Sequence, residues 1–232
     1  MKYDAIIQCR FSSTRLPSKI LLPLKPNISS LDILIQNLKK IKKIKNIILV
    51  TPKDDFKIIF DKYVNKYNIK IFSPNISYSD VLQRYYLCSK KFKSKNLIRI
   101  TSDCPFINIH ILDKMLTNYE KNNFNYLTNN IPRYIPHGFD CEILTSKILE
   151  YINQKARSKY DREHVTTWYR KYKNHLIHKT KIYKINYSKI RITLDNPTDY
   201  LFFVKNYEIL YKLSQSPHHE KILKQINRLQ HK

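Results

Sequence analysis

Residues 3–21 read YDAIIQCRFSSTRLPSKIL. The first seven residues form a short apolar run, which predicts a buried β-strand. The loop that follows carries the cations Arg10, Arg15 and Lys19 among four hydroxyl side chains. A polyphosphate needs several cationic and N–H donors held together, and a loop behind a strand can supply them. The stretch therefore predicts a phosphate-binding loop, with a solvated basic loop as the ordinary alternative.

The glycine-rich motifs that usually cradle phosphate are absent from this loop. The 232-residue chain contains one glycine, Gly138, so neither the Walker A pattern nor the dinucleotide fingerprint is present. Gly138 lies in the motif PHGFDCEIL (136–144). In a chain so poor in glycine, this residue indicates a backbone conformation that other residues cannot adopt.

Strand and helix patterns alternate through the first half of the chain. Apolar runs predict strands, and apolar side chains at helical spacing predict helices. The predicted strands are 3–9, 46–51, 69–72 and 96–102, and the predicted helices are 29–41, 54–67 and 79–92, the last with Ser79 as its N-cap. Such alternation favours a parallel sheet covered by helices on both faces. Because these sheets bind ligands at the carboxyl ends of their strands, the four loops that follow the strands should share one edge.

The second half is less regular, and it contains no clear domain boundary. Strands are predicted at 126–129, 139–144, 181–185 and 190–194, and helices at 145–154, 158–172, 196–213 and 214–232. Asn196 followed by Pro197 is typical of a helix start. We therefore expect one α/β domain over residues 1–232, ending in a C-terminal helix.

Two motifs, RITSDCPFI (99–107) and RITLDNPTDY (191–200), share one layout. In each, an arginine lies within a predicted strand, an aspartate comes directly after the strand, and a proline stands two residues after the aspartate. Asp103 and Asp195 therefore fall at strand ends, where they could share one Mg²⁺. This metal typically takes one or two protein carboxylates together with phosphate oxygens. The alternative for each aspartate is a helix N-cap.

Two further motifs offer polar side chains that could contact a substrate. Asp140 and Glu142 are two residues apart on a predicted strand, so both should face one side. An ordinary solvent-facing strand side is the alternative. In YDREHVTTWYR (160–170), Glu163 and His164 stand near the start of a predicted helix. This helix could read a substrate, although an ordinary amphipathic helix is the favoured interpretation.

The composition is strongly basic, with a formal net charge of +25. Such a balance suggests nucleic acid, but the cations are mostly lysines spread along a chain that is also rich in Ile, Asn and Tyr. This composition is as typical of an AT-rich coding sequence as of a surface selected to bind nucleic acid. We therefore expect no specific nucleic-acid partner. No apolar run approaches the roughly 18 residues of a membrane helix, and no secretory signal is present, which predicts a soluble cytoplasmic protein without a membrane partner. The four cysteines fit no zinc spacing.

Six motifs appear in order and at natural spacings. They are IIQCRFSSTRLPSKIL, SDVLQRYY, RITSDCPFI, HGFDCEIL, DREHVT and RITLDNPTDY. Over about residues 3–210 the chain closely resembles the cytidylyltransferase family that includes the acylneuraminate and Kdo cytidylyltransferases. It is most similar to the branch labelled spore coat polysaccharide biosynthesis protein F.

The resemblance implies an α/β fold of the nucleotide-diphospho-sugar transferase type, a Rossmann-like, GT-A-type three-layer sandwich around a mixed, mostly parallel sheet. It implies a nucleotidyltransferase that uses CTP and Mg²⁺ and couples CMP to a sugar, with a nonulosonic or related sugar acid as acceptor. Pyrophosphate would be released, and the product would serve surface polysaccharide biosynthesis. It also implies a homodimer, with residues 130–190 as a sugar-binding and dimerisation region. Three alternatives stay open. One is a glycosyltransferase that consumes a nucleotide-sugar, for which the usual D-x-D motif is absent, and another is a nucleotidyltransferase acting on a sugar phosphate. The third is a non-catalytic protein that binds nucleic acid through its basic charge.

The same resemblance implies roles for individual residues. The catalytic residues would be Arg10, Lys19 and Asp103. The nucleotide-binding residues would be Arg10, Ser12, Ser13, Arg15, Lys19, Asp80, Arg84 and Asp103. The substrate-binding residues would be Arg133, Asp140, Glu142, Glu163 and His164, and the metal ligands would be Asp103 and Asp195. The family commonly has glycine where this chain has Ser12 and Ser18, and serine reaches glycine-only backbone angles at a cost. The loop backbone is therefore the place where we expect a departure from the family.

Overall fold

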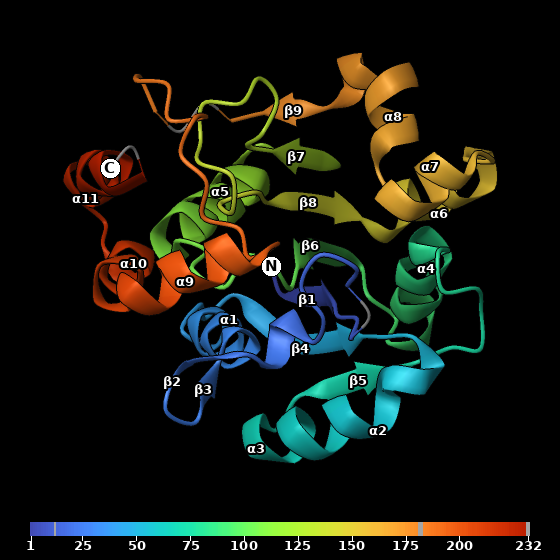
Figure 1. Cartoon of the computed structure of the whole chain (residues 1–232). Helices are drawn as coiled ribbons and strands as arrows, with labels where there is room; N and C mark the ends of the chain where they lie inside the picture. Colours follow the sequence, from blue (N-terminus) through green and yellow to red (C-terminus); the bar gives the residue numbers. More distant parts are fainter. Residues whose placement is uncertain (12, 181–182, 231–232) are drawn as a thin grey trace.

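A seven-stranded sheet organises the fold in the computed structural model, which describes residues 1–11, 13–180 and 183–230 (Figure 1). In spatial order the strands are β5 (Lys70–Phe72), β4 (Ile44–Val50), β1 (Tyr3–Gln8), β6 (Asn96–Thr101), β8 (Glu142–Thr145), β7 (Tyr126–Thr128) and β9 (His178–Lys179). The first four are parallel, β8 is antiparallel to both of its neighbours, and β9 is parallel to β7. The predicted mixed, mostly parallel sheet is confirmed.

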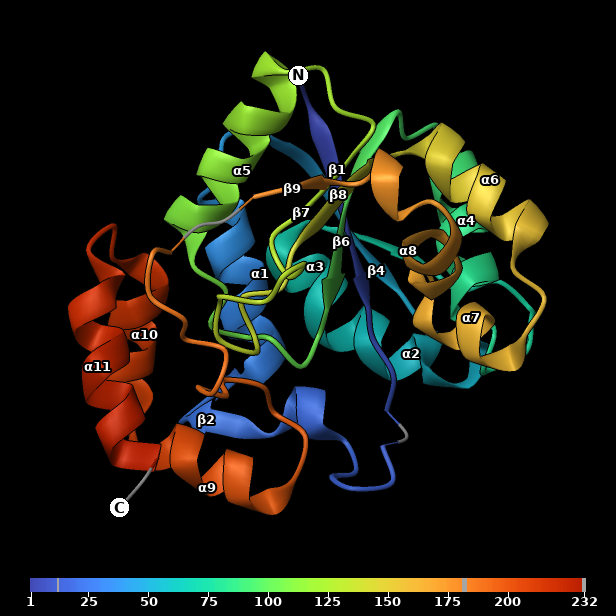
Figure 2. The same cartoon turned by 90° about the horizontal axis from the view of Figure 1, so that it is seen from above.

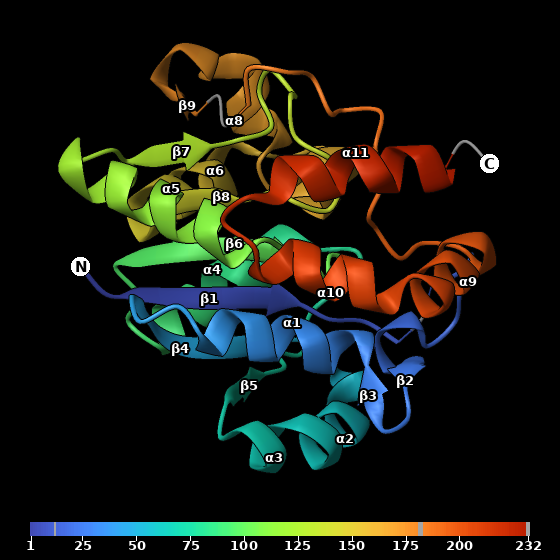
Figure 3. The same cartoon turned by 90° about the vertical axis from the view of Figure 1, so that its left-hand side faces the viewer.

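Helices cover the sheet on both faces and complete three layers (Figure 2). One layer contains α1 (Ser30–Lys39), α5 (Ile109–Lys121), α9 (Pro197–Lys205), α10 (Tyr207–Gln215) and α11 (His219–Gln230), and Figure 3 looks onto it. The same core receives a helical segment made of α2 (Phe56–Ile59), a π-helical turn (Phe60–Val64) and α3 (Asn65–Tyr67). The other layer contains α4 (Val81–Lys91), α6 (Ser146–Lys155), α7 (Lys159–His164) and α8 (Thr167–Tyr172).

The central strands are mostly apolar because both of their faces are buried. In β1, Ala5 and Ile7 pack into the core under α1 and α5, whereas Ile6 packs into the core under α4 and α6. The register places Gln8 beside both Val50 of β4 and Thr101 of β6. Three strands therefore end at one level, which confirms that the loops after them share one edge of the sheet.

Two predicted helices are each divided in the structure. The segment 158–172 forms α7 and α8, because the chain turns sharply at Val165, where φ is +64°. The segment 196–213 forms α9, begun by Asn196 as predicted, and α10, with a turn at Asn206. The N-cap of α4 is Asp80 rather than Ser79, because the Asp80 carboxylate accepts the Gln83 N–H at 3.0 Å.

The strand predictions of the second half are partly wrong. The strand predicted at 139–144 begins only at Glu142. Residues 181–182 lie outside the described residues, and 183–185 form no strand. The run 190–194 forms only an isolated bridge, because its N–H groups reach separate segments: Ile192 N–H donates to His137 at 2.7 Å and Leu194 N–H to Asp103 at 2.8 Å. The edge strand β9 and the small hairpin of β2 (Pro23–Lys25) and β3 (Ile28–Ser29) were not predicted.

Gly138, the single glycine of the sequence, adopts the glycine-specific backbone conformation that was predicted for it. Its φ is +106°, a region that side chains other than glycine rarely enter. A Cβ atom at this position would overlap the carbonyl group of Ile192. Glycine therefore lets the segment before β8 approach the segment that leads to Asp195.

None of the helices in the described ranges combines the length and the apolar character needed to cross a lipid bilayer.

Candidate active site

The basic loop follows β1 at the shared edge of the sheet. Three hydrogen bonds fix its ends: Cys9 N–H to the Val50 carbonyl at 2.9 Å, Phe11 N–H to the Asp55 carboxylate at 2.7 Å, and Ser18 N–H to the Phe11 carbonyl at 3.0 Å. Ser18 has φ +55° and ψ +21°, a left-handed conformation that directly precedes the 3₁₀ turn holding Lys19. Ser18 thus adopts a left-handed backbone conformation that favours glycine. Ser12 lies outside the described residues.

Lys19 joins the two aspartates that were predicted to share a metal. Its ammonium nitrogen lies 2.8 Å from Asp195 Oδ1 and 3.6 Å from Asp103 Oδ2. The three side chains are 12%, 13% and 25% exposed, so each is shielded but open on one side. Residues 176 positions apart therefore meet beyond the carboxyl end of β6, although the segment before Asp195 is not the strand that was predicted there.

Asp195 is the most heavily paired of these carboxylates. Besides Lys19 it accepts a hydrogen bond from Arg191, and the Arg15 guanidinium lies 3.5 Å away. Burial would raise the pKa of Asp195, but the hydrogen bonds and charges of Lys19 and Arg191 outweigh burial and hold that pKa below its ordinary value. Asp195 is therefore ionised at neutral pH.

The donor set fits Mg²⁺ that arrives with a polyphosphate. Within the described ranges, no group of three or more His, Cys, Asp or Glu side chains could hold a metal ion by itself. Asp103 and Asp195 instead supply two carboxylates around one ammonium group. This agrees with the one or two protein carboxylates that Mg²⁺ typically takes beside substrate phosphates.

The remaining described loop residues point to other partners. Arg10 lies 3.9 Å from Glu163 of α7, and its guanidinium lies 5.8 Å from the Tyr78 ring centroid. Ser13 Oγ accepts the Leu16 N–H at 3.4 Å inside the loop. The loop therefore presents its cations on two sides, toward Asp195 and toward α7.

Asp80 and Arg84 are engaged in the scaffold beside the loop. Asp80 caps α4 and receives two hydrogen bonds, of 2.9 and 2.8 Å, from Arg162 of α7. Arg84 is 1% exposed and donates to the carbonyl groups of Ser77 and Tyr78. Burial lowers the pKa of Arg84. These two residues fix the segment before α4, and their proposed contact with a nucleotide would be made through that segment.

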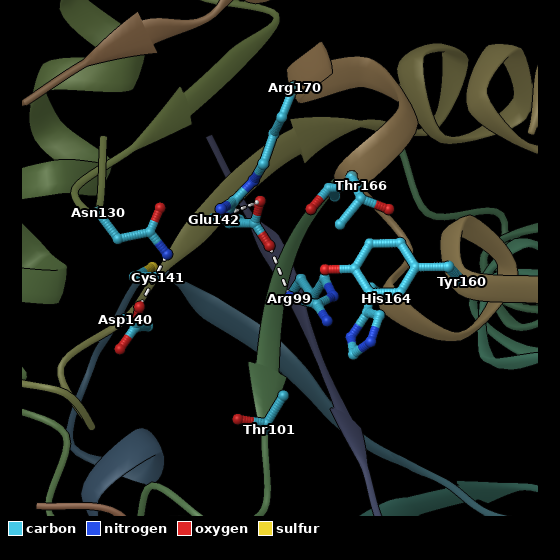
Figure 4. A pocket seen from close by; sticks show the side chains of 11 residues that line it. Arg99, Thr101, Asn130, Asp140, Cys141, Glu142, Tyr160, His164, Thr166 and Arg170 are labelled. Carbon is cyan, nitrogen blue, oxygen red and sulfur yellow. Dashed lines mark hydrogen bonds and ion pairs between the residues drawn. The ribbon is translucent and has the colours of Figure 1, made fainter. Parts of the chain in front are cut away.

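A cavity of about 240 Å³ opens beside β6 and β8, and Thr101, two residues before Asp103, lines it (Figure 4). Glu142 forms its inner wall, between Arg99 of β6 at 2.6 Å and Arg170 of α8 at 2.7 Å, and it also accepts from Tyr126. Burial would raise the pKa of Glu142, but the charges of Arg170 and Arg99 outweigh burial and lower that pKa to about 2. The carboxylate is therefore ionised at neutral pH, held in a clamp by Arg99 and Arg170.

Asp140 occupies the same cavity on the side of the sheet edge. It pairs with Arg133 and accepts hydrogen bonds from Asn130 Nδ2 at 2.8 Å and Gly138 N–H at 3.2 Å. Burial would raise the pKa of Asp140, but Arg133 outweighs it and holds the pKa below its ordinary value. Asp140 and Glu142, two of the residues that the sequence assigned to substrate binding, thus line one cavity, and Arg133 adjoins it through its pair with Asp140.

The segment of α7 and α8 closes the cavity. His164 lines it and packs against Tyr160 with ring centroids 4.3 Å apart, and Thr166, Thr167 and Arg170 complete this wall. Glu163 does not line the cavity. Arg99 and Arg170 were not predicted as site residues, although Arg99 is the first residue of the motif RITSDCPFI.

Comparison with known proteins decides the family. The profile of the family described as cytidylyltransferase matches residues 5–231, nearly the whole chain. The chain belongs to the cytidylyltransferase family. It is 34% identical over 216 residues to an uncharacterized protein of Methanocaldococcus jannaschii, covering 88% of this chain and 83% of that protein. It is 28% identical over 211 residues to the spore coat polysaccharide biosynthesis protein SpsF of Bacillus subtilis, covering 84% and 82%.

Solved structures agree with this family assignment. A cytidylyltransferase from Leptospira borgpetersenii is similar with a TM-score of 0.83 and 27% identity, covering 100% of this chain and 96% of that one. A CMP:2-keto-3-deoxy-manno-octonic acid synthetase solved with CTP is similar with a TM-score of 0.68 and 12% identity, covering 90% and 99%, a likeness that concerns the fold. The cytidylyltransferase described here is thus a nucleotidyltransferase with the predicted Rossmann-like fold, and its resemblance to the SpsF branch is confirmed.

Proposed function

We propose that this cytidylyltransferase transfers CMP from CTP to a hydroxyl group of a sugar acid, with release of pyrophosphate, for surface polysaccharide biosynthesis. The observation that carries the proposal is the meeting of Lys19, Asp103 and Asp195 beside a cavity walled by arginines. The cluster suits a polyphosphate, and the cavity suits a second, smaller substrate. The relatives named above support CTP as the donor.

The triphosphate would lie over the 10–19 loop. There Arg15 and Lys19 are within reach of Asp195, and together with loop N–H groups they can neutralise phosphate charge. Asp103 and Asp195 would hold Mg²⁺, which, when bound, neutralises the charge of the phosphates and of the leaving pyrophosphate. Positioning and charge neutralisation account for most of the rate in transfer reactions of this kind.

The acceptor would lie in the cavity. Two arginines, Arg99 and Arg170, share the single carboxylate of Glu142, so this wall keeps an excess positive charge that favours an acid. Their Nε groups are buried without a hydrogen-bond partner among the described residues, which favours a polar ligand. In the reaction, the acceptor oxygen bonds to the α-phosphorus, the bond from that phosphorus to pyrophosphate breaks, and the hydroxyl proton is lost.

Asp140 would orient the acceptor rather than act as a strong base. Its pKa is held below the ordinary value, and Arg133 and Asn130 already use both of its oxygens. A carboxylate in this state accepts hydrogen bonds from sugar hydroxyl groups but takes up a proton poorly. The homodimer that the resemblance implies stays a prediction.

A melting panel with CTP, ATP, GTP and UTP, each with Mg²⁺, tests the donor. CTP is expected to raise the melting temperature most. A pyrophosphate-release screen over nonulosonic acids, Kdo and sugar phosphates then tests the acceptor. Release with a sugar acid supports the proposal, release only with a sugar phosphate overturns the acceptor class, and equal stabilisation by all four nucleotides overturns the choice of CTP.

A further inference from the structure

The chain makes a γ-turn at Val165, between α7 and α8. Val165 has φ +64° and ψ −59°, and the N–H of Thr166 donates to the carbonyl group of His164 at 2.7 Å. This hydrogen bond spans only two residues. A γ-turn with positive φ is rare and strained, and for a β-branched residue such a φ is a clear outlier.

The turn changes which side chains share a surface. Along a continuous helix, residues two positions apart point roughly 200° away from each other. His164 and Thr166 are two positions apart, yet both line the cavity, together with Tyr160 and Arg170 (Figure 4). The γ-turn therefore brings Thr166 onto the wall that His164 lines, whereas a single helix over 158–172 would point these two side chains in nearly opposite directions.

Contacts on both sides hold the turn against its strain. The Val165 side chain is fully buried in the core formed by α4, α6 and α8. Arg162, before the turn, binds Asp80 of α4, and Arg170, after it, binds Glu142 of β8. Strained backbone of this kind persists only where its surroundings determine it, and it gathers at functional sites.

We propose that Val165 is a positioning residue, whose γ-turn holds His164 and Thr166 against the acceptor. This inference rests on the proposed function in one respect, the identity of the cavity as the acceptor site. Val165 itself does not line the cavity. Its side chain anchors the turn from the core side, and its backbone sets the direction of its two neighbours.

Two substitutions separate the backbone conformation from the side chain. Val165→Ala and Val165→Gly both remove the buried anchor, but only glycine accepts positive φ without strain. We expect Val165→Gly to melt at a higher temperature than Val165→Ala. The matched control is Ile152, buried in the same core in the interior of α6, where Ile152→Ala should melt above Ile152→Gly.

Substrate binding should follow the same order as the melting temperatures, with Val165→Gly closer to the wild type than Val165→Ala. With CTP, Mg²⁺ and the sugar acid that the screen identifies, Val165→Ala should raise KM for the acceptor about tenfold, because small misplacements at a reacting site are costly. Val165→Gly should restore most of that loss, and KM for CTP should stay unchanged in both variants. An Ala variant with the wild-type acceptor KM, or one that melts above the Gly variant, would overturn the proposal.

A measurement without ligand keeps this test separate from the proposed function. The ring of His164 packs against Tyr160, so its NMR signals, assigned by their loss in His164→Gln, should carry a ring-current shift. That shift should move in Val165→Ala and stay in Val165→Gly. If no sugar acid is turned over, the proposed acceptor class fails, while unmoved His164 signals in Val165→Ala overturn the role of Val165 independently.

Discussion

The ammonium group of Lys19 lies 2.8 Å from the carboxylate of Asp195. The same nitrogen is 3.6 Å from Asp103, so one cation bridges the two carboxylates proposed to hold the metal. Asp195 also pairs with Arg191 and Arg15, whereas the ion pair of Asp103 among the described residues is the one with Lys19. Lys19 thus connects the phosphate loop to both carboxylates.

Replacing Lys19 by methionine should lower kcat for pyrophosphate release by about 10²–10³-fold, because a charge that stabilises the transition state is lost. Steady-state kinetics with CTP and Mg²⁺ measure this effect. Lys25→Met, which removes a lysine paired with Glu208 away from the cluster, is the control and should leave kcat unchanged. Near-normal turnover by Lys19→Met would remove Lys19 from the catalytic set.

The pairing of Glu142 with Arg99 and Arg170 should make the free energy of unfolding depend on pH. The pKa of Glu142 in the folded protein is about 2, below its ordinary value of 4.5. The stability that this group contributes is therefore complete above about pH 4.5 and is lost as the pH falls toward 2. Urea unfolding of the wild type between these pH values should show the loss.

Glu142→Gln should remove that pH dependence and destabilise the protein by about 3 kcal/mol at neutral pH, because Arg99 and Arg170 would lose their shared charge partner. The control is Glu150→Gln, which breaks an exposed pair with Lys90 and should change the free energy of unfolding by less than about 1 kcal/mol. Equal effects of the two substitutions would contradict the buried clamp.

The motifs predicted much of the fold and part of the candidate site from simple physics. Apolar runs located the central strands because both of their faces are buried. Asp103 and Asp195 each contact Lys19, but Asp195 follows an irregular segment and not the strand that was predicted before it. The turn at Val165 was missed because the surrounding residues keep a helical pattern, and a strained turn is maintained by distant partners. Glu142 was found, but its partners Arg99 and Arg170 were not, since pairing across β6, β8 and α8 leaves no local signal.

Ser18 offers a test of the loop backbone. Its left-handed conformation costs a residue with a Cβ atom roughly 1–2 kcal/mol. Glycine avoids this strain, but part of the gain is cancelled because glycine loses more conformational entropy on folding. Ser18→Gly should therefore raise stability by about 0.5–1 kcal/mol, or about 1–4 °C in melting temperature. Ser18→Ala keeps the strain and should bring no gain. A Gly variant that melts no higher than the Ala variant would contradict the strained loop.

Pyrophosphate release by Asp103→Asn is the most direct measurement of the central claim. The wild type should release pyrophosphate from CTP in the presence of Mg²⁺ and a sugar acid. Asp103→Asn should lose at least about 10³-fold in kcat, because the metal and phosphate charges lose a carboxylate partner, while its melting temperature stays close to that of the wild type. Asp113→Asn, an exposed carboxylate of α5, is the matched control and should retain full activity. Near-normal kinetics of Asp103→Asn would contradict the account.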